Sequence, residues 1–464
     1  MRIIKQLIFF FLLIFQLPAQ GQEMWGISNS NFSGNMGIFL NPSTIVGAPY
    51  QYEINIIAAD AFAENTFLYF PQKEKVDSKL LFGTLPVGKI YFPRGSGLQS
   101  AFAHGMVIGP SYIRNKTSWA WGIHSAFRSE FSFTDVSADL ALLLYNSFHY
   151  YPLIGNKISI QPLTSAYASW FELGGTYGRV FTENEKHLLK WAATGNVLLG
   201  MNGYYYDQRA MEFTARDSST VTVHRFDATY AQAMGNSFFG LRGLGLSTTL
   251  GATYISHPNR GAFDCNMSND KLRKYKYRLG FSLLDLGIIH YFNQSEVLNV
   301  NTGTDRVWNG IDTIKFGSFR ALDTTLITNI GGSLSKKNFN IWLPLALSVQ
   351  FDYQLRPNLF ANASIVNRIH FTANEIARGN QFNTSVRYER RRYEGSLNFT
   401  LFEYKQPSLG LGLRYRFFVI GTDRLLQMLG LSDVKAFDFF FGFKFQFCKK
   451  PFSKGPDCPA YLSQ

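Results

Sequence analysis

The chain has 464 residues, of which 45 are basic and 32 acidic, so its formal net charge is +13 with histidine neutral. Aromatic residues make up 16% of the chain and charged residues only 17%, against ~25% charged residues in ordinary soluble domains. This composition excludes a disordered chain, and the length excludes a disulfide-stapled miniprotein.

The first segment has the pattern of a secretory signal peptide. Two basic residues precede the apolar run 7–15, and the small residues Ala19 and Gly21 suit cleavage before Gln22. We therefore expect residues 1–21 to be removed on export. No later segment offers the ~18 consecutive apolar residues that a transmembrane helix needs, so the mature chain is predicted to lack a helical anchor.

Residues 22–50 precede the first predicted strand and show no regular alternation. They combine asparagine and serine with Gly34, Gly37 and Pro42, which suit an irregular and tightly packed segment. Asn41-Pro42 is also an ordinary turn dipeptide, so a plain turn competes with any more specific interpretation.

Residues 51–447 are dominated by alternation with period two, which is typical of β-strands. The clearest case is 437–447, where six phenylalanines share one face. A soluble edge strand could not leave that face exposed. The same pattern predicts thirteen further strands, at 52–58, 65–70, 98–110, 119–133, 165–181, 189–206, 221–234, 246–257, 275–292, 341–353, 359–371, 381–404 and 409–419.

Many of these runs reach the ~9–11 residues with which a tilted strand crosses a bilayer. We therefore predict an all-β fold, a single closed antiparallel transmembrane barrel of about 14 strands (range ~12–16) with its apolar faces toward lipid. If Gln354–Asn358 and Lys405–Ser408 are short periplasmic turns, 381–404 is one long strand whose charged half extends beyond the outer leaflet.

The face opposite the apolar one carries charged and large polar side chains, which fit a wet or ion-paired lumen. These ions are predicted to pair across strands, with direct ligand contact as the alternative. The lumen-facing candidates are Arg128, Glu130, Glu172, Arg368, His370, Arg414, Arg416, Lys444, Trp170 and Trp342.

Few residues suggest catalysis or metal binding. The eight histidines are scattered singly, no cysteine pair has zinc spacing, and no Gly-x-Ser-x-Gly, Walker or dinucleotide motif occurs. We predict no enzyme, metal site, cofactor or nucleic-acid partner. The tail 448–464 is expected to hang in the periplasm, where Cys448 and Cys458 would form a disulfide or remain free thiols.

The stretch from Trp25 to Ile45 resembles the start of the FadL superfamily of hydrophobic-compound transporters, including the PorV-type proteins of secretion machinery. The Asn-Pro-Ala signature of that superfamily is matched by Asn41-Pro42, and Ser43 departs from its alanine. The stretch is also similar to an uncharacterised Bacteroidota outer-membrane barrel family that opens with Gly-Ile-Ser-Asn-Ser-Asn-Phe-Ser-Gly. The resemblance implies that residues 22–50 form a plug inside the barrel.

Two classes of function compete on this basis. The FadL resemblance implies uptake of a hydrophobic compound across the outer membrane of a Gram-negative bacterium, past the plug or through a gap in the wall. PorV-type relatives imply a non-enzymatic platform for a secretion or surface complex. An apolar pocket lined by Trp170, Trp342, Phe360 and Phe440 would favour uptake, whereas a packed, charged lumen with large ordered loops would favour the platform. Outer-membrane lipid and lipopolysaccharide are expected partners in both cases.

Overall fold

The computed structural model describes residues 23–66, 69, 97–116, 118–137, 140, 154–235, 237, 239–259, 274–311 and 319–447. The predicted signal peptide, the tail 448–464, its proposed disulfide and Cys265 lie outside these residues. Among the described residues, no helix is long and apolar enough to cross a membrane.

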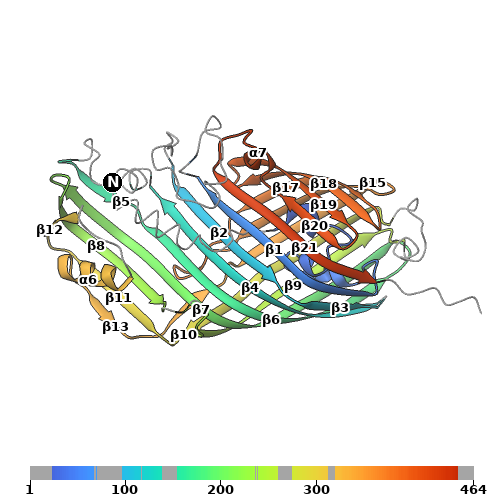
Figure 1. Cartoon of the computed structure of the whole chain (residues 1–464), viewed down its shortest axis with the longest axis horizontal. Helices are drawn as coiled ribbons and strands as arrows, with labels where there is room; N and C mark the ends of the chain where they lie inside the picture. Colours follow the sequence, from blue (N-terminus) through green and yellow to red (C-terminus); the bar gives the residue numbers. More distant parts are fainter. Residues whose placement is uncertain are drawn as a thin grey trace, which may run out of the picture.

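The strands form one closed antiparallel barrel of fourteen wall positions (Figure 1), which confirms the predicted fold class. The sheet closes where β1 (Tyr52–Asn65) pairs with β21 (Ala436–Phe447), with Tyr52 opposite Phe447. The last predicted strand is therefore the last strand of the wall.

Several wall positions are built from two or three collinear strands. In chain order, the wall consists of β1, β2 (Gln99–Ile108) with β3 (Ser111–Asn115), β4 (Trp119–Val136), β5 (Lys157–Ile160) with β6 (Leu163–Glu183), β7 (His187–Ala215), β8 (Thr220–Ala233) with β9 (Gly243–Ser256), β10 (Tyr277–Tyr291) with β11 (Ser295–Thr302) and β12 (Arg306–Asn309), β13 (Ser333–Ser335) with β14 (Phe339–Trp342) and β15 (Ala346–Arg356), β16 (Leu359–Arg368), β17 (Gln381–Glu389), β18 (Tyr393–Phe402), β19 (Gln406–Tyr415), β20 (Phe418–Thr422) and β21.

Two predicted strands are hairpins in the structure, so those predictions are wrong. The range 381–404 divides into β17 and β18, with Glu389 opposite Glu394, and 409–419 divides between β19 and β20 at Arg416. The proposed turns 354–358 and 405–408 consequently lie at opposite ends of the barrel. Of the range 65–70, only its first residue lies in a described strand, β1.

The two ends of the barrel differ. The end that we call the turn end carries Tyr52, Phe447 and short turns such as 184–186 and 390–392. The opposite, loop end carries longer connections, including residues 369–380 between β16 and β17. Outer-membrane barrels have short periplasmic turns and longer extracellular loops, so we expect the turn end to face the periplasm.

The wall is taller on one side than on the other, as the left part of Figure 1 shows. β7 has 29 residues, whereas β18 and β19 have 10 each. On this tall side an apolar core forms against α6 (Phe319–Asn329), with Phe226 and Leu298 of the sheet packed near Leu326 of the helix. The other face of the same strands carries polar side chains such as Arg209 and Asp227.

The exterior of the wall is apolar, as the alternation predicts. Ile123, Leu246, Phe281, Val386 and Leu397 each expose at least 50% of their surface. Side chains that alternate with them, including Arg128, Glu172 and Lys444, are almost fully buried inside the barrel. Such an exterior fits a hydrocarbon layer, because a closed sheet leaves no backbone donor or acceptor unpaired toward lipid.

We predict that replacing Phe445 and Phe447 together by Asp prevents assembly in the membrane. Both rings lie on the exterior, 37% and 47% exposed, on the strand that closes the barrel. A charge on the lipid face costs more the deeper it lies. The folded barrel in the membrane fraction, measured as the heat-modifiable band on a gel, should disappear. The matched Phe→Leu pair should retain that band, and equal loss in both pairs would contradict a lipid-facing role.

Candidate functional site: the filled lumen and the interrupted wall

The N-terminal segment, residues 23–50, lies inside the barrel, where Figure 1 draws it in blue. It contains two short helices, α2 (Trp25–Ser28) and α3 (Asn35–Ile38), and the 3-10 turn η1 (Pro42–Ile45). Its apolar side chains are almost fully buried against inward residues of several strands; Met36, for example, packs near Ala58, Met106 and Phe440. This packing fills the lumen toward the turn end.

Asn41 holds the sharp turn in this segment. Its Oδ1 accepts hydrogen bonds from the backbone N–H and the hydroxyl of Ser43, at 3.0 and 2.7 Å. Its Nδ2 donates to Gln350 Oε1 of β15 at 2.9 Å, and the Ser43 hydroxyl lies 2.6 Å from that of Thr253 in β9. The Asn41-Pro42 turn is thereby tied to two wall strands.

Gly34 and Gly37 lie where larger residues would not fit. Gly34 has a φ of +62°, and a side chain there would overlap the carboxylate of Glu53. A Cβ at Gly37 would lie 2.3 Å from the Ser33 hydroxyl oxygen. Both positions therefore require glycine in this packed segment.

Lys444 and Glu53 anchor the segment to the seam of the wall. Lys444 Nζ donates to the backbone oxygens of Phe32, at 2.6 Å, and Ser33. Glu53 Oε1 accepts from both the backbone N–H and the side chain of Asn35, at 2.7 and 3.0 Å. The charged side chains of β1 and β21 thus serve as direct ligands of the segment's backbone.

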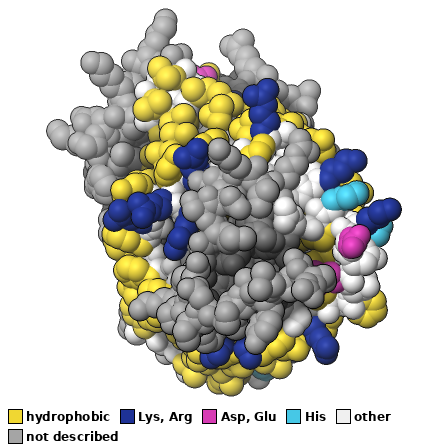
Figure 2. Space-filling model, turned by 90° about the vertical axis from the view of Figure 1, so that its right-hand side faces the viewer, with side chains coloured by type: hydrophobic (Ala, Val, Ile, Leu, Met, Phe, Trp, Pro, Cys, Tyr) yellow, Lys and Arg dark blue, Asp and Glu magenta, His cyan; other side chains and the backbone are white. Residues whose placement is uncertain are grey.

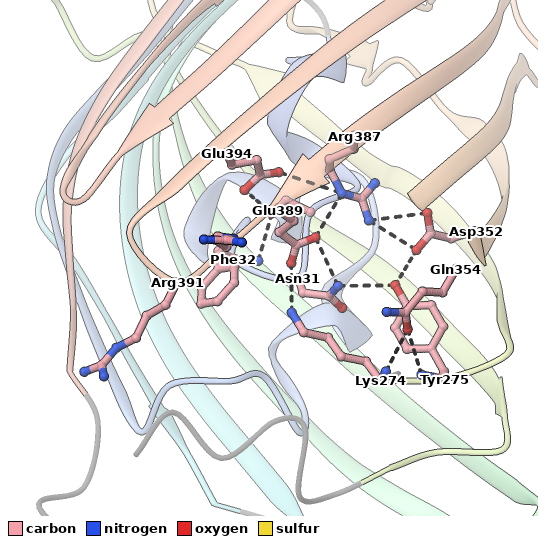
Figure 3. Close-up of polar contacts among 12 residues, drawn as sticks. Asn31, Phe32, Lys274, Tyr275, Asp352, Gln354, Arg387, Glu389, Arg391 and Glu394 are labelled. Carbon is pink, nitrogen blue, oxygen red and sulfur yellow. Dashed lines mark hydrogen bonds and ion pairs between the residues drawn. The ribbon is translucent and has the colours of Figure 1, made fainter. Parts of the chain in front are cut away.

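A second anchor is the cluster around Arg387, near the turn end (Figure 3). Arg387 lies 3.2 Å from Asp352, 3.0 Å from Glu389 and 3.8 Å from Glu394. Glu394 also pairs with Arg414, whose Nε lies 3.0 Å from its Oε2. We call these five residues the Arg387 network.

The Arg387 network holds the N-terminal segment through hydrogen bonds. Ser30 Oγ donates to Glu394 at 2.8 Å, and Asn31 Nδ2 donates to Glu389 at 3.2 Å. The Arg414 guanidinium lies over the ring of Phe32, 4.4 Å from its centroid. The predicted pairing of lumenal ions thus includes the N-terminal segment as well as the wall.

A third cluster, which we call the Arg128 network, lies deeper in the lumen. Arg128 contacts Asp285 and Glu130 at 2.8 Å each and Glu172 at 3.8 Å, and it lies over the ring of Trp170. Asp285 also pairs with Arg378 at 2.6 Å.

Arg378 links this network to the N-terminal segment. It belongs to the connection 369–380, which folds inward from the loop end, and its second contact is Glu23 at 3.1 Å. Burial raises the pKa of Glu23 to about 7, although the Arg378 charge acts in the opposite direction. The segment and the inward connection therefore meet at one buried ion pair.

The remaining predicted lumenal residues lie elsewhere. Arg368 pairs with Glu403 at 3.5 Å and is partly exposed, and His370 lies beyond the end of β16 with its side chain 59% exposed. Arg416 is at a turn, over the exposed ring of Tyr415. Trp342 packs against Phe371 on the exterior, because the interruption at 343–345, which includes a proline without an N–H, reverses the alternation.

An apolar cluster lines the lumen beside the tall side of the wall. We call it the lumenal apolar cluster, and its fully buried members come from five wall positions and the inward connection. They are Ala166, Ala168, Trp170, Leu198, Ala231, Ala233, Ile289, Tyr291, Val297, Phe339, Ile341, Leu343 and Ile376. Sequence patterns identified only Trp170 among these residues as lumen-facing.

The wall is interrupted beside this cluster. β7 pairs with β9 as far as Gly200 opposite Gly243, and with β8 from Gly203 opposite Ala233. On the other side of the interval, Tyr291 of β10 lies opposite Gly243, and Ser295 of β11 lies opposite Ala233. We call the interval between Ala233 and Gly243 the wall break.

Arg242 fixes the exterior side of the wall break. It is 2% exposed, and its guanidinium donates to the backbone oxygens of Met201, at 2.8 Å, and Ser237, at 2.6 Å. Its Nε donates to Gln294 Oε1 at 2.9 Å. Arg242 thereby links Met201 of β7 on one side of the break with Gln294, between β10 and β11, on the other side.

Tyr291 covers the lumenal side of the wall break. Its ring lies so close to Gly203 that a Cβ there would be 2.5 Å from it, and a Cβ at Gly243 would be 3.0 Å away. The ring stacks on Phe339 at 5.3 Å, and its hydroxyl donates to the Asn202 carbonyl at 2.8 Å. Glycines in neighbouring strands thus let one tyrosine close the interval.

The fold and its interior define an outer-membrane type of β-barrel with a filled lumen. A model described as "Family of unknown function (DUF5723)" matches residues 103–423, so the chain belongs to this family. A search of curated proteins found no match. Among the described residues, no group of three or more histidine, cysteine or acidic side chains could hold a metal ion.

Several solved structures have a similar fold. They include the toluene transporter TbuX of Ralstonia pickettii, with 10% identity, a TM-score of 0.41 and coverage of 93% of this chain and 100% of that one. The toluene transporter TodX of Pseudomonas putida also has 10% identity and a TM-score of 0.41, with coverage of 90% and 95%. A FadL homologue of Pseudomonas aeruginosa has 10% identity, a TM-score of 0.41 and coverage of 93% and 99%.

We predict that Lys444→Met loosens the N-terminal segment. The substitution removes the ammonium group that donates to the backbone oxygens of Phe32 and Ser33, and a hydrogen bond to a charged group contributes about 1.5–3 kcal/mol. Residues 23–50 should then be cut by protease faster than in the wild type, while the barrel stays folded. The control Lys186→Met removes an exposed turn lysine and should change nothing; equal cleavage in both variants would contradict this anchor.

We also predict a pH dependence centred on Glu23. Its folded pKa of about 7 lies above the ordinary 4.5, so the stability it contributes is complete below 4.5 and is lost as pH rises through 7. The protection of residues 23–45 against hydrogen exchange, measured relative to the intrinsic exchange rate at each pH, should therefore fall over this interval in the wild type. Glu23→Gln should flatten that part of the profile; an unchanged profile would assign it to another group.

Proposed function

We propose that this protein is an outer-membrane channel for a hydrophobic compound, which passes from the lumen through the wall break. The supporting observation is the position of the lumenal apolar cluster, which adjoins the wall break between Ala233 and Gly243. Toward the turn end, the N-terminal segment and the charged networks occupy the lumen. A hydrophobic solute therefore meets its most favourable surroundings beside the interruption.

The route begins on the inner face of the tall side, which is solvated. Arg209 is 45% exposed and pairs there with Asp207 and Asp227. The lumenal apolar cluster includes Ile376 of the inward connection. We infer that moving this connection admits the solute to the cluster.

The exit is closed by Tyr291. Because the ring contacts Gly203 of β7 and Gly243 of β9, its rotation would open the lumenal side of the break, while Arg242 holds the exterior side. Phe239 and Leu241 lie beside the break on the exterior and are 73% and 49% exposed. A solute that leaves here reaches the apolar exterior and the N-terminal segment stays in place.

The test is transport by the purified protein in vesicles. Toluene and octane serve as hydrophobic probes, and glucose serves as the hydrophilic control. Tyr291→Ala should raise hydrophobic flux several-fold and leave glucose flux at background. Tyr254→Ala, on the exterior of β9, is the matched control and should leave both fluxes unchanged.

A second variant tests entry rather than exit. Ile376→Asp places a carboxylate in the lumenal apolar cluster, which should lower hydrophobic flux by roughly tenfold because a buried charge opposes an apolar solute. Thr372→Asp introduces the same charge elsewhere in the connection and should have little effect. Flux that is unchanged by both Tyr291→Ala and Ile376→Asp would contradict this route.

A platform for a secretion or surface complex is the second candidate. The tall side favours it, because its strands, α6 and their apolar core form an ordered structure that extends beyond the rest of the rim. The apolar pocket expected from sequence does not form, because its four residues lie apart. Trp170 belongs to the lumenal apolar cluster, Phe360 and Phe440 are buried in two other clusters, and Trp342 lies on the exterior. Purification from native membranes in mild detergent, with identification of proteins and small molecules, distinguishes the candidates. A stoichiometric partner without a bound hydrophobic compound would favour the platform.

A further inference from the structure

Cations stack on aromatic rings around the turn end. Arg114 lies over Tyr52 at 5.4 Å from its centroid, and Lys116 lies over Trp119 at 4.7 Å. Further pairs place Arg390 over Tyr388 and Tyr393, at 5.6 and 5.7 Å, and Arg416 over Tyr415, at 5.5 Å. We call Arg114, Lys116, Arg390 and Arg416 the rim cations.

These pairs lie on the lipid side of the wall. Tyr388, Tyr393 and Tyr415 are 38%, 43% and 60% exposed, and they alternate with buried side chains of the lumen. Tyrosine and tryptophan at such positions mark the membrane–water interface of barrels. A cation stacked just beyond the ring therefore lies at the level of lipid headgroups.

Further basic residues continue around the same end. Figure 2 shows this end, with Lys and Arg side chains spaced around its perimeter. Of the rim cations, Lys116 and Arg416 are exposed and Arg114 and Arg390 are partly buried; the other exposed bases at this end are Arg179, Lys186, Lys276, Arg356, Arg391 and Arg392. Among the described residues near these turns, the exposed acids are Glu183 and Glu185. At the loop end, exposed bases such as Arg216, Arg306, Lys336 and Lys337 are interspersed with the exposed acids Asp135, Asp217, Asp305 and Asp433.

We propose that the rim cations bind the phosphates of anionic phospholipids in the leaflet at the turn end. The pairs occur on β1, β3, β4, β17, β18 and β19, and the additional cations extend the ring to β6 and β15. A bound protein would need one contiguous patch, whereas surrounding lipid contacts every strand. The ring-like distribution therefore fits lipid headgroups, and it is independent of the proposed transport.

Each aromatic ring has a defined part in this arrangement. The ring face attracts the cation and limits its conformations, which lowers the entropy lost when a phosphate binds. The ring edge remains among the acyl chains, so one pair contacts both parts of a phospholipid. A basic side chain near an anionic lipid surface contributes about 1 kcal/mol, equivalent to about a fivefold preference.

The test compares lipid retention by full-length protein. The barrel is purified in detergent containing equal amounts of phosphatidylglycerol and phosphatidylethanolamine, and retained lipids are counted by native mass spectrometry. The wild type should retain phosphatidylglycerol preferentially, and the preference should fall as ionic strength rises. Equal retention of the two lipids would overturn the proposal.

Two variants with four substitutions each locate the site. The rim variant carries Arg114→Gln, Lys116→Gln, Arg390→Gln and Arg416→Gln, and it should lose about fivefold in preference for each lipid site affected. The control carries Arg216→Gln, Arg306→Gln, Lys336→Gln and Lys337→Gln at the loop end and should behave as the wild type. Heat modifiability on gels verifies that both variants fold.

Other outcomes identify a different ligand. If both variants lose the preference equally, net charge is responsible and the rim has no special role. If an acidic protein copurifies with the wild type and is absent from the rim variant, while lipid retention is the same in both, the ring binds a protein. Tyr415→Leu retains every cation and should lower the preference partially; an unchanged preference would remove the ring from the site.

Discussion

Closure of the sheet is the constraint on which the rest of this structure depends. A strand edge cannot face hydrocarbon without unpaired N–H and C=O groups, so β1 must find β21 across almost the whole length of the chain. That pairing places Tyr52 beside Phe447 and leaves the preceding residues only a short distance from the mouth of the barrel. The N-terminal segment consequently enters the lumen at the seam, where Glu53 and Lys444 of the two closing strands hold its backbone.

Filling the lumen creates an electrostatic problem that the charged networks solve. Ions removed from water are costly unless they are paired and hydrogen-bonded. Arg387 and Arg414 meet carboxylates of the wall, and those carboxylates accept hydrogen bonds from Ser30 and Asn31 of the segment. The segment is therefore part of the ion-pairing arrangement, and its withdrawal would leave several buried charges incompletely solvated. This consideration favours a route that leaves the segment in place.

The sequence pattern predicts the exterior well because lipid demands an apolar residue at every second position. It predicts the total number of strands correctly, although some individual strands are wrong, because two strands predicted in excess offset two strands that are missed. The wall break makes one wall position look like two strands, and the range 65–70 suggests a strand of its own. Two strands are missed because the turns 390–392 and Arg416-Phe417 contain no glycine or proline, and the alternation therefore continues through both hairpins. Trp342 is assigned to the wrong face because alternation resumes with opposite parity after Pro344.

The interior resists prediction for a different physical reason, since its contacts join residues hundreds of positions apart and no local period records them. Glu23 meets Arg378, and Ile376 joins the buried cluster that contains Ile341 and Trp170, only because the connection 369–380 folds inward. One local signal does exist at the wall break, where Gly200, Gly203 and Gly243 border a stretch that interrupts alternation. Alone, these glycines suggest a turn. In the structure, Tyr291 packs on these glycines. Because the wall carries no side chains at these positions, a single aromatic ring closes the interval from inside. Arg242 holds the interruption on its exterior face and Tyr291 covers it on the lumenal face, and Tyr291 is the side chain that moves in the proposed route.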